Sequence, residues 1–220
     1  MSGPQFTLYH YWRSSSSWRV RFALHHKGIA FTPVAVDLLN GESESPEHLK
    51  RNPAGFVPVL EFLNGPHQGA FLSESLSIIR FLEEAYPNSP TLFPGNAFDH
   101  ARIWSLSEII NSGTQPLANI PVNAFHSDDA EEQKRWARHW MKTGLETYET
   151  HCRKHAGDFS YGNQFSLADI CLIPQLYNAD RFGVDLKDCP TLLKVRENVK
   201  KLPAYTLSEP DSYKPVDFKG

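Results

Sequence analysis

The chain has 220 residues, of which 40% are hydrophobic and 21% are charged, so it is long enough for one large or two small domains. Its formal net charge of −3 gives no support for a nucleic-acid or membrane-surface partner, and we predict neither. No apolar run approaches the roughly 18 residues of a membrane span and the start lacks the pattern of a secretion signal, so we expect a cytoplasmic protein.

The first 85 residues alternate between strand and helix patterns. Val20, Ala23 and Leu24 share one face of the first predicted helix, and Asn64-Gly65 predicts a tight hairpin turn. The predicted elements are strand 5–11, helix 15–27, strand 31–38, short helix 44–52, strands 57–63 and 69–72, and helix 73–86. This β-α-β-α-β-β-α order predicts an α/β N-terminal domain of the thioredoxin-like type.

A proline-rich break follows, and helix patterns take over after it. Ser166 and Asp169 have the spacing of a capping box at the start of one predicted helix. The predicted helices cover residues 98–113, 129–155, 166–182 and 190–202. We therefore predict a thioredoxin-like domain over 1–86, a linker over 87–96 and an all-α C-terminal domain over 97–220, with a loosely packed tail from about Ser208.

The three cysteines, Cys152, Cys171 and Cys189, form an odd number without CxxC spacing. This pattern argues against a disulfide framework and against a zinc site. We predict three buried or partly buried thiols in a reducing compartment and no metal site.

Four consecutive serines, Ser14 to Ser17, lie where a predicted strand runs into a helix. The N-terminus of a helix leaves backbone N–H donors unpaired at the positive end of the dipole. Ser14 or Ser15 can cap that helix, which leaves a second hydroxyl to face a thiolate, carboxylate or phosphate. The alternative is that the serines are only caps and turn residues.

Two downstream segments favour an anion-binding pocket. Val57-Pro58 opens a predicted strand, where a cis proline would leave the Val57 backbone able to pair with an extended peptide. Glu74-Ser75 opens a helix whose N-terminal N–H groups suit an α-carboxylate. Together with the serine run, these segments describe a pocket for a short acidic peptide that carries a thiolate.

These residues resemble the zeta class of the cytosolic glutathione transferases, whose best-known members are maleylacetoacetate isomerases. The resemblance covers nearly the whole chain. The segments that carry it are "YWRSSSSWRVRFAL" (11–24), "NPAGFVPVLE" (52–61), "SESLSIIRFLEE" (73–84), "GTQPLAN" (113–119) and "FSLADICLIPQLYNADRFGVDL" (165–186). The chain departs from the pattern at Ser16, where the family usually has cysteine, so a hydroxyl replaces a second sulfur.

The resemblance implies a glutathione cofactor and a role for each matching residue. Its thiolate would add to the cis double bond of maleylacetoacetate and leave after rotation, so glutathione would be needed but not consumed. Ser15 or its neighbour Ser14 would donate a hydrogen bond to the thiolate, with Ser16 alongside. The other implied cofactor-binding residues are Val57, Pro58, Glu74, Ser75, Gln115 and Asn119.

Arg181 is the predicted ligand of a substrate carboxylate, with Arg13 or Arg19 as helpers, because a guanidinium matches carboxylate geometry. An alternative for Arg19 and Arg21 is a solvated helix face or an interdomain ion pair. Two alternative functions also stay open: a transferase that conjugates or dehalogenates small electrophiles, and a non-catalytic module that binds a partner protein. The resemblance further implies a homodimer.

Overall fold

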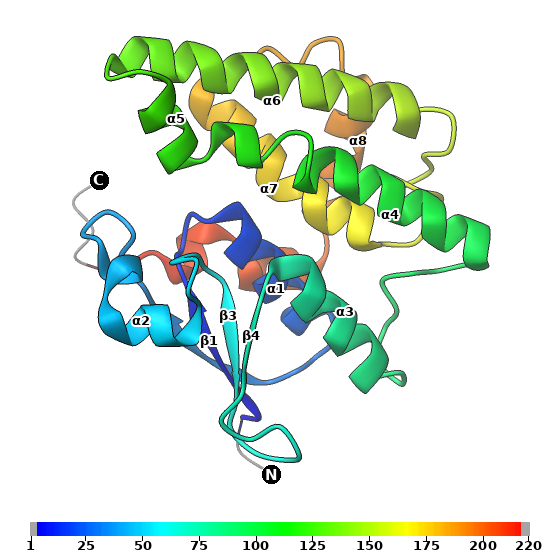
Figure 1. The fold of residues 1–220 in the computed structure, drawn as a ribbon. Coiled ribbons are helices and arrows are strands. Elements are labelled where there is room, and N and C mark those ends of the chain that lie inside the picture. Colours follow the sequence, from blue (N-terminus) through cyan, green and yellow to red (C-terminus); the bar gives the residue numbers. More distant parts are fainter. Residues whose placement is uncertain (1–3, 217–220) are drawn as a thin grey trace. The chain divides into compact units, whose positions relative to one another are not determined.

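The computed structural model describes residues 4–216, which divide into two compact units (Figure 1). One unit contains the residues up to Thr91 together with those from Pro203 on. The other unit is Leu92–Leu202.

The first unit is built on one mixed four-stranded sheet. Its strands are β1 (Phe6–His10), β2 (Phe31–Ala35), β3 (Val59–Phe62) and β4 (Phe71–Ser73), in the spatial order β2-β1-β3-β4. β1 pairs in parallel with β2 and antiparallel with β3, and β3 pairs antiparallel with β4. Because β2 is an edge strand, Pro33 is accommodated there without removing a ladder hydrogen bond inside the sheet.

The helices of this unit are α1 (Ser15–His26), α2 (Pro46–Arg51) and α3 (Ser75–Ala85), with a short 3-10 turn, η1, at Glu42–Glu44. α1 and α3 pack against each other, and α2 and α3 lie on opposite sides of the strands in Figure 1. Buried Lys27, after the end of α1, forms an ion pair of 2.7 Å with Glu83 of α3. The predicted β-α-β-α-β-β-α thioredoxin-like order is confirmed.

The connection between β3 and β4 corrects one prediction. Positive φ angles occur at Gly65 and Gly69 rather than at an Asn64-Gly65 pair. The Phe62 N–H donates to the Ala70 carbonyl at 3.1 Å, so the strands join through residues 63–70. The predicted two-residue turn is wrong because β4 starts only at Phe71 and the chain needs these residues to return to it.

The second unit is helical. It contains α4 (Ala97–Asn111), α5 (Ile120–His126), α6 (Ala130–Cys152), α7 (Leu167–Phe182) and α8 (Pro190–Val199), with a 3-10 turn, η2, at Pro116–Ala118. α4, α6 and α7 pack on one another, as Figure 1 shows. The predicted capping box at α7 is confirmed, since the Ser166 N–H donates to Asp169 Oδ2 at 2.9 Å. The three cysteines are buried and free, as predicted.

The C-terminal segment differs from the prediction. α9 (Pro203–Ser208) and a 3-10 turn, η3 (Pro210–Tyr213), belong to the first unit, whereas we predicted a tail of the helical domain that is loose from about Ser208. Ser208 is fully buried. Trp18 Nε1 of α1 donates to Ser208 Oγ and Arg21 Nε donates to the Ser208 carbonyl, both at 3.0 Å. These buried donors need acceptors, and α9 supplies them.

Candidate active site

The serine run combines a helix cap with a hydroxyl donor. Ser14 is the N-cap of α1, in an extended conformation, and its Oγ accepts the Ser17 N–H at 3.2 Å. Ser17 is fully buried and its own Oγ accepts the Tyr11 N–H at 3.3 Å. A serine hydroxyl has acceptor lone pairs and a separate proton, so the half-buried Ser14 can cap the helix and still donate to an anion.

The first turn of α1 favours negative charge in front of it. Ser15 is buried and Ser16 is half-buried, and neither α1's first turn nor its cap carries an acidic residue. The positive end of the helix dipole is therefore not neutralised by the helix itself. A thiolate or carboxylate at this position would be stabilised by about 0.3–1 kcal/mol from the dipole.

The start of α3 is a second place for an anion. Glu74 is the only non-glycine residue within 4–216 with a positive φ (φ 67°), a conformation that costs about 1–3 kcal/mol. The N-terminus of α3 has no side-chain cap, so its first backbone N–H groups lack the usual acceptor. Ser75 is buried, and its Oγ accepts from Arg19 Nη1 at 3.4 Å. A carboxylate from outside the chain fits this uncapped end.

Val57 lies just before β3 and its peptide bond with Pro58 is cis. In the sheet register Val59 pairs with Tyr9 on one side and Ser73 on the other, and Val57 lies outside this register. The Val57 backbone is therefore not occupied by the ladder between the strands.

Three predicted ligand-holding segments adjoin the sheet at one edge, which the end of β1, the start of β3 and the end of β4 form together. β1 ends one residue after Tyr9, β3 begins at Val59 and β4 ends at Ser73, and these three residues are neighbours across the sheet. The serine run follows β1, Val57 precedes β3, and Glu74-Ser75 follows β4. The thiolate, peptide and carboxylate sites expected from the sequence thus converge.

The structure corrects one alternative for Arg19 and Arg21, the solvated helix face. Arg19 and Arg21 are both fully buried, so neither belongs to a solvated helix face. Arg19 reaches Ser75, which suits support of the α3 start better than direct contact with a substrate. Arg13 is half-buried, with its guanidinium 4.7 Å from the centre of the Trp12 ring.

Arg21 holds the segment that leads into the serine run, a role the sequence did not reveal. Its Nη2 donates to the Trp12 carbonyl at 2.9 Å, and its Nη1 lies 3.1 Å from His10 Nδ1. Burial lowers the pKa of Arg21 to about 9, and burial together with the Arg21 charge lowers the pKa of His10 to about 3. His10 is therefore neutral at pH 7 and accepts the Arg21 hydrogen bond.

The remaining predicted residues lie in the second unit. Gln115 Nε2 donates to Asn119 Oδ1 at 2.6 Å, so the structure brings this predicted pair together at η2. Arg181 is exposed near the end of α7, where its Nη1 donates to Asn178 Oδ1 at 3.3 Å.

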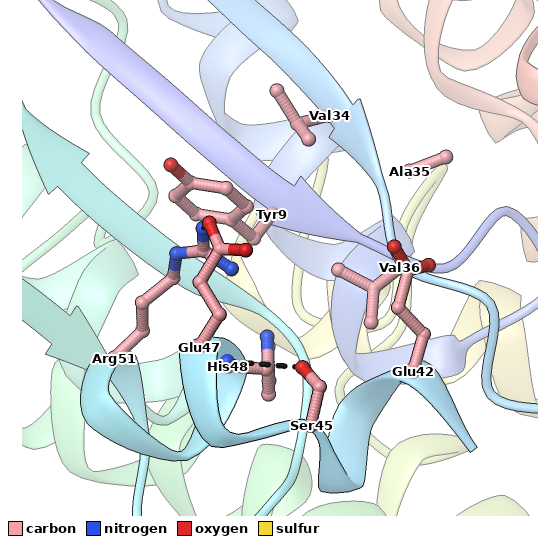
Figure 2. A pocket seen from close by; sticks show the side chains of 9 residues that line it. All are labelled: Tyr9, Val34, Ala35, Val36, Glu42, Ser45, Glu47, His48 and Arg51. Carbon is pink, nitrogen blue, oxygen red and sulfur yellow. Dashed lines mark hydrogen bonds and ion pairs between the residues drawn. The ribbon is translucent and has the colours of Figure 1, made fainter.

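A cavity of about 150 Å³ lies elsewhere in the first unit, between α2, η1 and strands β1 and β2 (Figure 2). Among its polar side chains, Arg51 forms an ion pair with Glu47, and the Arg51 guanidinium lies 4.1 Å from the centre of the Tyr9 ring. None of the predicted glutathione-binding residues lines it. The candidate site is therefore the sheet edge and not this cavity.

Residues 4–216 contain no group of three or more His, Cys, Asp or Glu side chains arranged to hold a metal ion. Within the same range, no helix is both long enough and apolar enough to cross a membrane.

Both units match models of known protein families. Residues 8–90 match the family model of the glutathione S-transferase N-terminal domain, and residues 114–205 match that of the C-terminal domain. The chain is 38% identical to a probable maleylacetoacetate isomerase 2 of Drosophila melanogaster, over 96% of this chain and 90% of that one. It is also 38% identical to a zeta-class glutathione S-transferase of Euphorbia esula, over 94% and 91% of the two chains.

A solved structure is similar over almost the full length. It is the maleylacetoacetate isomerase of Anaeromyxobacter dehalogenans with GSH bound in its active site. The TM-score is 0.88 at 41% sequence identity, covering 98% of this chain and 99% of that one.

Proposed function

Because the chain belongs to the glutathione S-transferase family, in its zeta class, we propose that it catalyses the glutathione-dependent isomerisation of maleylacetoacetate to fumarylacetoacetate. The observation that carries this proposal is the convergence of the serine run, Val57 and Glu74-Ser75 at one sheet edge. The relatives named as maleylacetoacetate isomerases support the choice of substrate.

The residues at this edge fit glutathione group by group. The uncapped start of α3, with Ser75 and the Glu74 carboxylate, would hold the charged γ-glutamyl end. The Val57 backbone, outside the sheet ladder, would pair with the cysteinyl peptide group. Arg19 would act behind Ser75 as a positioning residue, since it is buried and donates to the Ser75 hydroxyl.

When bound, glutathione supplies the thiol sulfur that acts as nucleophile. The Ser14 hydroxyl would donate to that sulfur in its ionised form, with Ser15 and Ser16 beside it at the start of α1. A hydrogen bond to a charged acceptor contributes about 1.5–3 kcal/mol, and the helix dipole acts in the same direction. Both effects lower the thiol pKa and keep more of the nucleophile ionised at neutral pH.

Three proposed roles concern the second unit and one the first. We keep Gln115 and Asn119 as proposed glutathione-binding residues, and Arg181, helped by Arg13, as the proposed ligand of a substrate carboxylate. A guanidinium binds a carboxylate through two parallel hydrogen bonds, which suits an acid with two such groups. The proposed homodimer rests on the resemblance alone, and sedimentation equilibrium would test it. The proposed cytoplasmic location rests on the sequence patterns described above.

The experiment is to incubate the protein with maleylacetoacetate, or maleylacetone as surrogate, with and without glutathione. The proposal expects isomerisation only when glutathione is present. Conjugation of α-halo acids without isomerisation would favour the alternative transferase function. Failure to bind glutathione-agarose at neutral pH would overturn both enzymatic functions and leave the non-catalytic binding module.

A further inference from the structure

The carbonyl of Phe56 is held by two buried side chains. His48 Nε2 lies 3.1 Å from it and Asn52 Nδ2 donates to it at 3.0 Å. His48 is 1% exposed and Asn52 is 5% exposed, although the Phe56 side chain itself is 52% exposed. Because a carbonyl only accepts, His48 Nε2 carries the proton in this contact.

α2 fixes the two donors in turn. Ser45 is the N-cap of α2 and its Oγ accepts the His48 N–H at 3.2 Å, the contact drawn in Figure 2. Asn52 is the C-cap of α2, and its Oδ1 accepts the Ala54 N–H at 3.2 Å. Both side chains therefore hold the segment before β3 from one short helix.

The Phe56 carbonyl and the Val57 N–H belong to one planar peptide group. Fixing the carbonyl oxygen fixes the plane, and hence the direction of the N–H on its other side. Val57 is the residue whose backbone we assign to the cysteinyl peptide group of glutathione. A ligand pairs more tightly with a donor that is already oriented, because less freedom is lost on binding.

We propose that His48 and Asn52 are positioning residues for glutathione, which orient the Val57 peptide group by holding the Phe56 carbonyl. The inference rests on the proposed function and adds to it one residue of α2, His48, and the C-cap of that helix, Asn52. Neither residue needs to touch glutathione.

The test measures the dissociation constant of reduced glutathione by calorimetry in wild type, His48→Phe, His48→Gln and Asn52→Asp. His48→Phe keeps a ring but loses the donor, and Asn52→Asp keeps the oxygen for the Ala54 N–H but loses the donor to Phe56. Each should raise the dissociation constant about tenfold, which equals about 1.4 kcal/mol. His48→Gln should recover most of the affinity, because its amide can donate in the same place.

Steady-state kinetics separate a positioning role from a merely structural one. For His48→Phe and Asn52→Asp, we expect kcat at saturating glutathione to stay near the wild-type value while the KM for glutathione rises. Glu47→Gln is the matched control, since Glu47 neighbours His48 on α2, has a side chain that is 78% exposed, and forms its ion pair with Arg51. It should bind glutathione like wild type.

The outcomes separate the inference from the proposed function. Wild-type affinity in both His48→Phe and Asn52→Asp, beside a wild type that binds glutathione, would overturn the inference alone. A wild type that does not bind glutathione would overturn the proposed function and the inference together. If His48→Phe does not fold, wild-type affinity in Asn52→Asp alone overturns the inference.

Discussion

Replacing Ser14 tests the two roles of its hydroxyl, as the cap of α1 and as the proposed donor to the glutathione sulfur. Ser14→Ala removes the acceptor of the Ser17 N–H, and loss of such a cap lowers the free energy of unfolding by about 1 kcal/mol. It also removes the proposed donor to the glutathione sulfur. A hydrogen bond to a charged acceptor is worth about 1.5–3 kcal/mol, and one pKa unit corresponds to 1.36 kcal/mol, so the thiol pKa of bound glutathione should rise by about 1–2 units.

Ser14→Gly is the control that isolates the donor. Glycine is nearly as good an N-cap as serine, with a difference of only a few tenths of a kcal/mol, so this variant should unfold close to wild type. It should nevertheless show the same rise in thiol pKa as Ser14→Ala, measured by titrating the thiolate absorbance of bound glutathione. If both variants titrate like wild type while Ser15→Ala or Ser16→Ala shifts, the donor is misassigned. If no serine variant shifts, the account of the serine run is wrong.

Three further predictions concern the first unit. Glu74→Gly should raise the free energy of unfolding by roughly 1 kcal/mol, because glycine tolerates the positive φ, yet weaken glutathione binding in calorimetry. The pKa of His10 is about 3 in the folded chain and near 6.5 in the unfolded chain. The free energy of unfolding should therefore fall below pH 6.5, by about 2 kcal/mol at pH 5 from this residue. Urea titrations at several pH values should show that this fall is absent in His10→Gln. Arg21→Met should lower the free energy of unfolding by about 3 kcal/mol, since the Trp12 and Ser208 carbonyls lose a charged donor, and a change under 0.5 kcal/mol would contradict this role.

Features set by local patterns were predictable from the sequence. The start of the first helix follows from its serine cap and its end from Gly28, which has a positive φ, and α3 follows from a strong amphipathic pattern. The capping box at Ser166 depends on two residues three positions apart, so its signal is local as well. The same holds for the candidate site, whose anion positions are both helix starts.

Features that depend on distant partners were not predictable. Arg21 has the pattern of a surface residue, and only the fold shows that it is buried against the carbonyls of Trp12 and Ser208. The partner of Trp18 is 190 positions away along the chain, so the packing of α9 left no local signal. The hydrogen bonds from His48 and Asn52 to the Phe56 carbonyl were not predictable either, because a backbone carbonyl carries no sequence signature.

The most direct test of the account counts product molecules per glutathione. Maleylacetone is supplied in large excess over glutathione, and the trans product and free thiol are both followed to completion. We expect many turnovers for each glutathione with no loss of thiol, and a slower rate in Ser14→Gly. Consumption of one glutathione per substrate molecule, or isomerisation without any glutathione, would contradict it.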